Sequence, residues 1–566
     1  MLTDVISLPS LEWCSPAVIP VVANLGTALL PALFAGLGTV AALVFKPKQL
    51  FRACRANPGR ALGTAVGMAA ALALGWWVFM APGPETPADG RRPGLAAVTG
   101  GGAATDWTKV ALELIRSGER RPAAVAIVAP TTGETVAITP VTSAVPVRTA
   151  PVLFRADAAR SGHGGGAAPK NLKPVWEYSE DNTMYLSAPL VADGYVFGAS
   201  CYIDPPKTYG SVFCLDAATG KELWNVARVK DRDGKDVDLM GFFSSPSLSA
   251  DGTSLVIGQG LHPDMNAELL CFDAATGALR WSAPTTLHIE SSPIIVGDLV
   301  VVGAGAIEDP ITKIPTGDPG YVFAVRLSDG VEVWRHAIND PESSPVAGPD
   351  GVIYIGSGFN GKAVVALRTA SDDELKAKGQ TRLVWTVPTP HPATGAVTLV
   401  GDLVLAGCGN GDFVFAAKNP SGMVIAIDRV TGAVRWRCEL PDAVLGSIAV
   451  RDGVAYCPVR NGELVAIDIA TGALLWRQQE TTARLSRKSP LLAGPAVAGG
   501  LIYAVSGDGY LGIFDATNGT LIERTYINAT NRPGEMGLST SSPWVVDGRV
   551  YVGSETGGMR CYEGTP

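Results

Sequence analysis

The chain of 566 residues lacks the short motifs by which many enzymes and metal-binding proteins are identified. Its nine cysteines include no C-x-x-C motif and no adjacent pair, which argues against a zinc ribbon or a covalently attached haem. Its five histidines show no metal-ligand spacing, and no P-loop, nucleophile elbow or metalloprotease helix occurs. A net charge of -8 argues against nucleic acid as a partner. We therefore assign no catalytic residue and expect no metal site.

Tryptophan, by contrast, recurs regularly. Seven tryptophans follow one another at intervals of 40 to 57 residues, which is typical of one β-propeller blade per repeat. We expect each indole ring to dock one blade against the next, where its N–H group needs a hydrogen-bond acceptor. The predicted docking residues are Trp176, Trp224, Trp281, Trp334, Trp385, Trp436 and Trp476.

Most of these tryptophans follow a turn of the form Asp-x-x-Thr-Gly. An alternating apolar run precedes the turn, which is typical of a half-buried strand. The aspartate can accept hydrogen bonds from backbone amides two residues on, and the glycine supplies the positive φ of a tight hairpin. The predicted turn residues are Asp216, Gly220, Asp273, Gly277, Asp428, Gly432, Asp468, Gly472, Asp515 and Gly519.

The number of hydrophobic strand pairs predicts an all-β fold, an eight-bladed propeller of four-stranded blades over residues 152–566. The last blade has only three strands before the chain ends. The segment Leu172–Tyr178 supplies its fourth strand, so that the ring closes without an open sheet edge. In the seventh blade Glu523 occupies the position of the tryptophan, and we expect its substitution to cost far less than that of a tryptophan.

The repeat of strand, Asp-x-x-Thr-Gly turn and tryptophan resembles the PQQ-like (pyrroloquinoline quinone-type) β-propeller repeat family. The stretch Phe154–Gly162 resembles the Phe-Arg-x-Asp…Arg-x-Gly segment that often precedes such propellers. The resemblance covers residues 152–564 and implies the fold. It implies no single function, because the family contains quinoprotein dehydrogenases and also non-catalytic scaffolds, such as the propeller lipoprotein of the outer-membrane protein assembly machine.

Dehydrogenases of this family carry adjacent cysteines in a disulfide ring, a carboxylate–Asn calcium site and a catalytic aspartate. Since this chain has no adjacent cysteine pair, we expect a non-catalytic protein-binding scaffold. The alternative is a membrane-bound quinoprotein oxidoreductase of the alcohol or aldose dehydrogenase type, with pyrroloquinoline quinone and calcium as cofactors. Long connections between second and third strands lie on one face, where we expect the partner to bind. These connections are residues 201–210, 258–268, 303–320 and 407–422.

Charged residues gather at the predicted mouth of the central channel, where the innermost strands begin. Carboxylates and a basic pair around one funnel could hold calcium and an anionic quinone. The interpretation we prefer is that Ser-Pro pairs begin the strands and the charges line a wet pore. The candidates are His288, Glu290, Glu342, Arg487 and Lys488. A disulfide between Cys201 and Cys214 is a further possibility that the sequence leaves open.

The N-terminal part has a different composition. Residues 17–45 and 61–81 contain no charged side chain and are long enough to cross a bilayer, whereas residues 46–60 carry five positive charges. The positive-inside rule then predicts a two-pass protein of the cytoplasmic membrane, with both termini and the propeller on the periplasmic side. A signal peptide is the rival interpretation of the first span, but no basic residue precedes Lys46.

Two further segments precede and follow the predicted membrane spans. We expect residues 1–16 to lie outside the cytoplasm. Residues 82–151 form a connector rich in proline, glycine and alanine, with a short amphipathic helix over 105–117. The expected partners are the lipid bilayer and an envelope protein that the sequence does not identify.

Overall fold

The computed structural model describes residues 150–566, except for 205–206, 232, 263, 307–316, 415, 479–489, 532–533 and 535. The membrane spans predicted over 17–45 and 61–81 and the helix predicted over 105–117 lie outside the described residues, as does the rest of the chain up to residue 149. In the part of the chain that the structure describes, no helix has both the length and the apolar character needed to cross a membrane.

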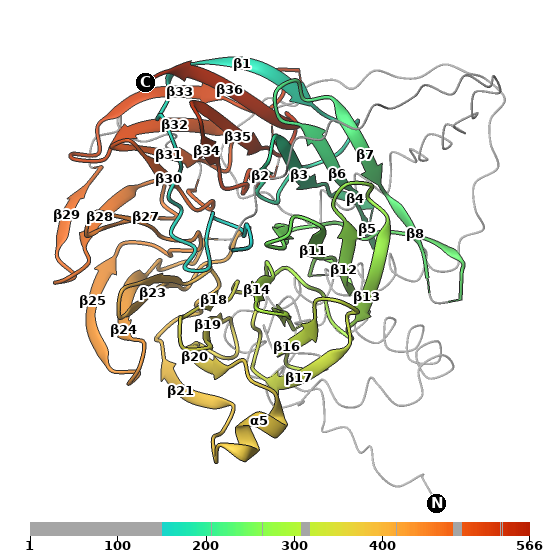
Figure 1. Cartoon of the computed structure of the whole chain (residues 1–566). Helices are drawn as coiled ribbons and strands as arrows, with labels where there is room; N and C mark the ends of the chain where they lie inside the picture. Colours follow the sequence, from blue (N-terminus) through green and yellow to red (C-terminus); the bar gives the residue numbers. More distant parts are fainter. Residues whose placement is uncertain are drawn as a thin grey trace, which may run out of the picture. The chain divides into compact units, whose positions relative to one another are not determined.

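Eight four-stranded antiparallel sheets surround a central axis, which confirms the eight-bladed propeller (Figure 1). The first strands of neighbouring blades contact each other around the axis. Blade 1 consists of β2 (Leu190–Ala192), β3 (Tyr195–Ala199), β6 (Val212–Asp216) and β7 (Glu222–Val226). Blade 2 consists of β10 (Ser247–Leu248), β11 (Ser254–Gly258), β12 (Glu268–Asp273) and β13 (Leu279–Pro284). Blade 3 consists of β14 (Ile294–Val296), β15 (Leu299–Ala304), β16 (Tyr321–Arg326) and β17 (Glu332–Ala337).

The next blades repeat this order from the axis outwards. Blade 4 consists of β18 (Val346–Ala347), β19 (Val352–Ser357), β20 (Ala363–Arg368) and β21 (Leu383–Pro388). Blade 5 consists of β22 (Thr398–Val400), β23 (Leu403–Gly409), β24 (Gly422–Asp428) and β25 (Val434–Leu440). Blade 6 consists of β26 (Ala449–Arg451), β27 (Val454–Pro458), β28 (Leu464–Asp468) and β29 (Leu474–Arg477). Blade 7 consists of β30 (Ala496–Ala498), β31 (Leu501–Val505), β32 (Tyr510–Asp515) and β33 (Leu521–Tyr526).

Blade 8 joins the two ends of the propeller, as predicted. Its strands are β34 (Trp544–Val546), β35 (Arg549–Gly553), β36 (Met559–Thr565) and β1 (Lys170–Tyr178). Strand β1 pairs antiparallel with β36, with Trp176 opposite Cys561, and Figure 1 shows the two strands side by side. Closure by a strand from the other end of the propeller leaves no open sheet edge between the first and last blades.

Outside the blades, the described residues form two hairpins and one short helix. Strands β4 (Tyr202–Asp204) and β5 (Lys207–Tyr209) form a hairpin, and so do β8 (Arg228–Lys230) and β9 (Asp236–Asp238). Helix α5 (Asp372–Ala377) connects β20 to β21. It begins at a capping box, in which Ser371 and Glu374 each accept from the other's backbone N–H.

The burial of each strand follows its place in the blade. Central strands such as β24 are buried along their whole length, because neighbouring blades cover both of their faces. Outer strands such as β13 alternate between covered and exposed residues. The described cysteines lie in this packed interior and are free thiols, so the possible disulfide between Cys201 and Cys214 is absent.

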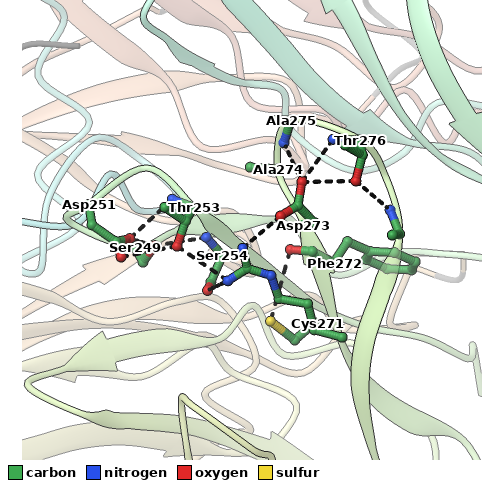
Figure 2. Close-up of polar contacts among 12 residues, drawn as sticks. Ser249, Asp251, Thr253, Ser254, Cys271, Phe272, Asp273, Ala274, Ala275 and Thr276 are labelled. Atoms are coloured by element: carbon green, nitrogen blue, oxygen red, sulfur yellow. Dashed lines mark hydrogen bonds and ion pairs between the residues drawn. The ribbon is translucent and has the colours of Figure 1, made fainter. Parts of the chain in front are cut away.

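The Asp-x-x-Thr-Gly turns have the hydrogen bonds that their sequence suggests. Figure 2 shows the turn of blade 2, where Oδ1 of Asp273 accepts from the backbone N–H groups of Ala275 at 3.2 Å and Thr276 at 3.0 Å. The Thr276 hydroxyl donates to the same oxygen at 2.9 Å. Each of the other predicted turn aspartates accepts at least one backbone N–H in the same way; these are Asp216, Asp428, Asp468 and Asp515.

The seven tryptophans each dock onto the next blade, five of them at these turns. Every indole N–H donates to a backbone carbonyl of the next blade at 2.8 to 3.2 Å; the acceptors are Ala217, Ala274, Leu327, Thr369, Arg429, Ile469 and Ala516. The turn glycine makes room for the ring, since a Cβ atom on Gly220 would lie 2.5 Å from the Trp176 indole. Gly277, Gly432, Gly472 and Gly519 receive Trp224, Trp385, Trp436 and Trp476 in the same way, all with positive φ.

Glu523 of β33 replaces the tryptophan at the seam between blades 7 and 8. Its two carboxylate oxygens accept the backbone N–H groups of Asn171 at 2.6 Å and Leu172 at 2.9 Å, both on the closing strand β1. Substitution of Glu523 is still expected to cost less than that of a tryptophan, but the carboxylate has a role that the sequence did not suggest, because it binds the closing strand. A carboxylate here satisfies two amides that a tryptophan could not, because the indole nitrogen is a donor only.

Candidate functional site at the mouth of the central funnel

Paired serines surround the axis where the innermost strands begin. The backbone N–H of Ser245 donates to Ser292 Oγ at 2.9 Å, and that of Ser292 donates to Ser344 Oγ at 2.8 Å. Ser291 Oγ donates to the carbonyl of Ser343 at 2.9 Å. The serines therefore join neighbouring blades. The sequence suggested only that the Ser-Pro pairs begin the innermost strands.

The segment that precedes β1 crosses the centre of the ring (Figure 1, cyan). The Arg160 guanidinium is fully buried there and donates to the carbonyls of Pro345 at 2.7 Å and Ser292 at 2.8 Å. Phe154 lines the central cavity above it, which has a volume of about 70 Å³. The Phe-Arg-x-Asp…Arg-x-Gly segment thus forms the floor of the funnel, and Arg155 and Arg160 donate to backbone carbonyls just before the innermost strands.

A wider cavity of about 280 Å³ forms the mouth of the funnel. Most of its wall is apolar: Leu186, Ile203, Phe243, Leu261, Phe359, Phe413, Val414, Met536 and Leu538. The rings of Phe243 and Phe413 meet edge to face, with their centroids 5.5 Å apart. Three of the four long connections predicted to form a binding face, 201–210, 258–268 and 407–422, contribute to this wall.

Two histidines and two glutamates form a compact polar cluster in one side of the mouth. His262 Nδ1 lies 3.0 Å from Glu342 Oε1 and 3.6 Å from Glu290 Oε1. His288 Nε2 lies 3.2 Å from the same Glu342 oxygen, and the two imidazole rings are 4.8 Å apart. We call these four residues the His–Glu cluster.

Charges within the His–Glu cluster shift the pKa values of its members. Burial opposes the ionisation of Glu342, but the charge of His262 and hydrogen bonds from both histidines outweigh it, so the pKa of Glu342 lies below its usual value. The charge of Glu342 in turn raises the pKa of His262 well above its usual value. His288 is completely buried, and its Nδ1 atom has no hydrogen-bond partner.

Local structure holds the cluster in place. His262 lies in the connection between β11 and β12, where Asp264 accepts the backbone N–H of Leu261 at 2.8 Å. The backbone N–H of His262 itself donates to Glu290 Oε1 at 2.9 Å. Gly305 backs the cluster, because a Cβ atom there would lie 2.7 Å from His288 Nε2. A side chain at position 305 would displace the imidazole.

The structure brings together three of the five predicted mouth residues, His288, Glu290 and Glu342. Arg487 and Lys488 lie outside the described residues. Sequence reasoning missed His262, because it judged the histidines by their spacing along the chain, and His262 and His288 stand in different connections. The available signal was that His262 falls in one of the long connections already expected to form the binding face.

The fold and the repeat define a PQQ-like β-propeller repeat protein. Residues 208–312 and 371–565, together more than half of the chain, match the family described as outer membrane protein assembly factor BamB. The chain therefore belongs to this family.

Curated relatives include enzymes. The chain is 25% identical over 290 residues to the quinohemoprotein alcohol dehydrogenase ADH IIB of Pseudomonas putida, a match that covers 48% of this chain and 36% of that protein. It is 25% identical over 237 residues to methanol dehydrogenase [cytochrome c] subunit 1 of Paracoccus denitrificans, which covers 39% and 34%. The chain thus spans about a third of the length of these relatives.

Among solved structures, the quinohemoprotein alcohol dehydrogenase of Comamonas testosteroni is similar with a TM-score of 0.51 and 14% identity, over 73% of this chain and 80% of that one. At this identity the similarity shows the fold alone.

Proposed function

We propose that the chain is a non-catalytic protein-binding scaffold of the cell envelope, and that the mouth of its propeller receives an apolar side chain of a polypeptide partner. The observation that carries this proposal is the apolar wall of the mouth, to which three of the long connections contribute. Burial of one large apolar side chain there contributes about 1.5–3 kcal/mol. Membership in a family described as an assembly factor supports the same role.

The composition of the mouth suits an anchor pocket. Interfaces draw most of their affinity from a few side chains that fill well-packed pockets. The paired rings of Phe243 and Phe413 supply a rigid wall, and Met536 supplies a flexible one that can adapt to the side chain that enters. Val414 remains 39% exposed at the edge of the mouth.

The proposal includes the anchorage of the chain. The uncharged segments 17–45 and 61–81 are two spans of the cytoplasmic membrane, and the basic loop 46–60 faces the cytoplasm. The propeller then faces the periplasm, where it meets its partner, an envelope protein.

The second candidate is a membrane-bound quinoprotein oxidoreductase, which the names of the curated relatives favour. The mouth fits the quinone poorly. Pyrroloquinoline quinone is anionic, whereas Glu290, Glu342 and Asp412 line the mouth and its described lining residues include no lysine or arginine. Calcium prefers six to eight oxygen ligands, and half of the cluster is imidazole.

Site-specific photo-crosslinking in native membranes tests the binding role. A photoreactive residue at Val414 in the full-length chain should give one discrete adduct, and Phe413→Asp should abolish it. Val430 is the matched control, because it is an exposed valine in the turn between β24 and β25 rather than in the mouth. Equal crosslinking from both positions, or an adduct from Val430 alone, would contradict the proposal.

A further inference from the structure

The His–Glu cluster contains donor atoms of the kind that first-row transition metals prefer. One ligand atom from each of His262, His288 and Glu290 lies within 4.8 Å of the others. We propose that these three residues, with Glu342 beside them, bind a single divalent transition-metal ion of the zinc class. This inference is independent of the partner-binding role proposed above, because it rests on the cluster alone.

The distances suit one ion. Zinc binds imidazole nitrogen and carboxylate oxygen at about 2.0–2.2 Å, so two ligand atoms around a tetrahedral ion lie about 3.4 Å apart. His262 Nδ1 is 3.6 Å from Glu290 Oε1 and 3.0 Å from Glu342 Oε1, and His288 Nε2 is 3.2 Å from that last oxygen. The donor atoms of His262, His288 and Glu290 all lie within 4.8 Å of one another, so they would draw together by at most about 1.4 Å to surround one ion.

The donor set also selects the metal. Imidazole nitrogen suits zinc, copper, nickel and iron, whereas calcium and magnesium prefer sites made of oxygen alone. A bound divalent ion would displace the proton of His262 to solvent, and the two carboxylates of Glu290 and Glu342 would then balance the charge of the ion. Charge balance matters here because Glu342 is largely buried, and an uncompensated charge would be costly.

The cluster is accessible from the mouth. The His262 side chain is 41% exposed and that of Glu290 is 14% exposed, and both line the cavity together with Glu342. With His262, His288 and Glu290 as its three ligands, an ion held there would keep a fourth coordination position open to the mouth, as catalytic zinc sites do. A water molecule or a side chain that enters the mouth would occupy this position.

Metal titration of the full-length purified chain, stripped with a chelator, tests the site. Zinc should bind in a calorimetric titration at one equivalent, and cobalt should give the visible absorption of a site with mixed nitrogen and oxygen ligands. Calcium at the same concentration should give no heat. His262→Gln and Glu290→Gln should each weaken zinc binding at least tenfold, because each removes a ligand.

His336→Gln is the control, since His336 lies on β17 outside the cluster, and it should leave zinc binding unchanged. His288 is completely buried, so the decision rests on the variants of the more exposed His262 and Glu290, each checked for an unchanged far-UV circular dichroism spectrum. The proposal is overturned if the stripped chain binds no zinc, if it binds calcium instead, or if both variants bind zinc as tightly as the parent chain.

Discussion

The rim of the propeller repeats one set of contacts from blade to blade, whereas the mouth is assembled from connections that differ in every blade. At the rim, seven tryptophans donate to equivalent carbonyls at 2.8 to 3.2 Å. Among the described residues of the mouth, the phenylalanine pair and the His–Glu cluster each occur once. The difference separates two tasks: the repeated contacts stabilise the ring, and the irregular connections provide a surface on which function can evolve.

The largest loss of stability is expected at a buried rim tryptophan. Trp334 is 3% exposed, donates to the Thr369 carbonyl at 2.8 Å and lies under the Arg382 guanidinium, 4.1 Å from the ring centroid. Trp334→Ala should lower the free energy of unfolding by about 3–5 kcal/mol, because it leaves a cavity between blades 3 and 4 that neighbours cannot fill. Denaturant titration of the full-length chain measures the loss, and a change below 1 kcal/mol would contradict a docking role.

A smaller loss is expected at the one seam without tryptophan. Glu523→Ala removes the acceptor of two backbone N–H groups on β1 and should cost about 1–3 kcal/mol. Glu563→Ala is the control. Glu563 is exposed, and its ion pair with Arg549, at 3.7 Å, is a surface pair that contributes about 0–1 kcal/mol. Equal midpoints for the two variants in a urea titration would show that Glu523 does not hold the closing strand.

The smallest effect on stability is expected at the mouth. Val414→Asp changes an exposed side chain outside the repeated contacts, so the free energy of unfolding should stay within about 0.5 kcal/mol of the parent value. The same substitution should abolish partner capture in a pull-down from solubilised membranes, because it places a charge in an apolar pocket. If Val414→Asp lowers the free energy of unfolding but still captures the partner, the mouth contributes to stability rather than to binding, which contradicts the account.

Most of the fold could be predicted from the sequence, because each blade repeats its signals locally. The turn at Asp273 and the tryptophan at Trp281 stand eight residues apart in one hairpin, so their spacing is visible along the chain. The closing strand followed from the unpaired end of blade 8.

The contacts that sequence reasoning missed join residues that are distant along the chain. Glu523 accepts hydrogen bonds from backbone amides more than 350 residues away. Every residue except proline has a backbone N–H group, so the residue types do not reveal which amides will meet this carboxylate. His262 and His288 meet only because their two connections fold towards the same side of the mouth. Glycine at position 305 matters for the same reason, since its role depends on the imidazole that lies against it.

Thermal unfolding of the full-length chain with pyrroloquinoline quinone and calcium tests the central claim, that the mouth is a binding site of a scaffold rather than the cofactor site of a dehydrogenase. A ligand present at a hundredfold excess over its dissociation constant stabilises the folded state by about 2.7 kcal/mol, which would appear as a clear rise in Tm. We expect no change in Tm and no alcohol- or aldose-dependent dye reduction. A rise in Tm that disappears when Glu290 and Glu342 are both changed to glutamine would contradict the scaffold and establish the oxidoreductase.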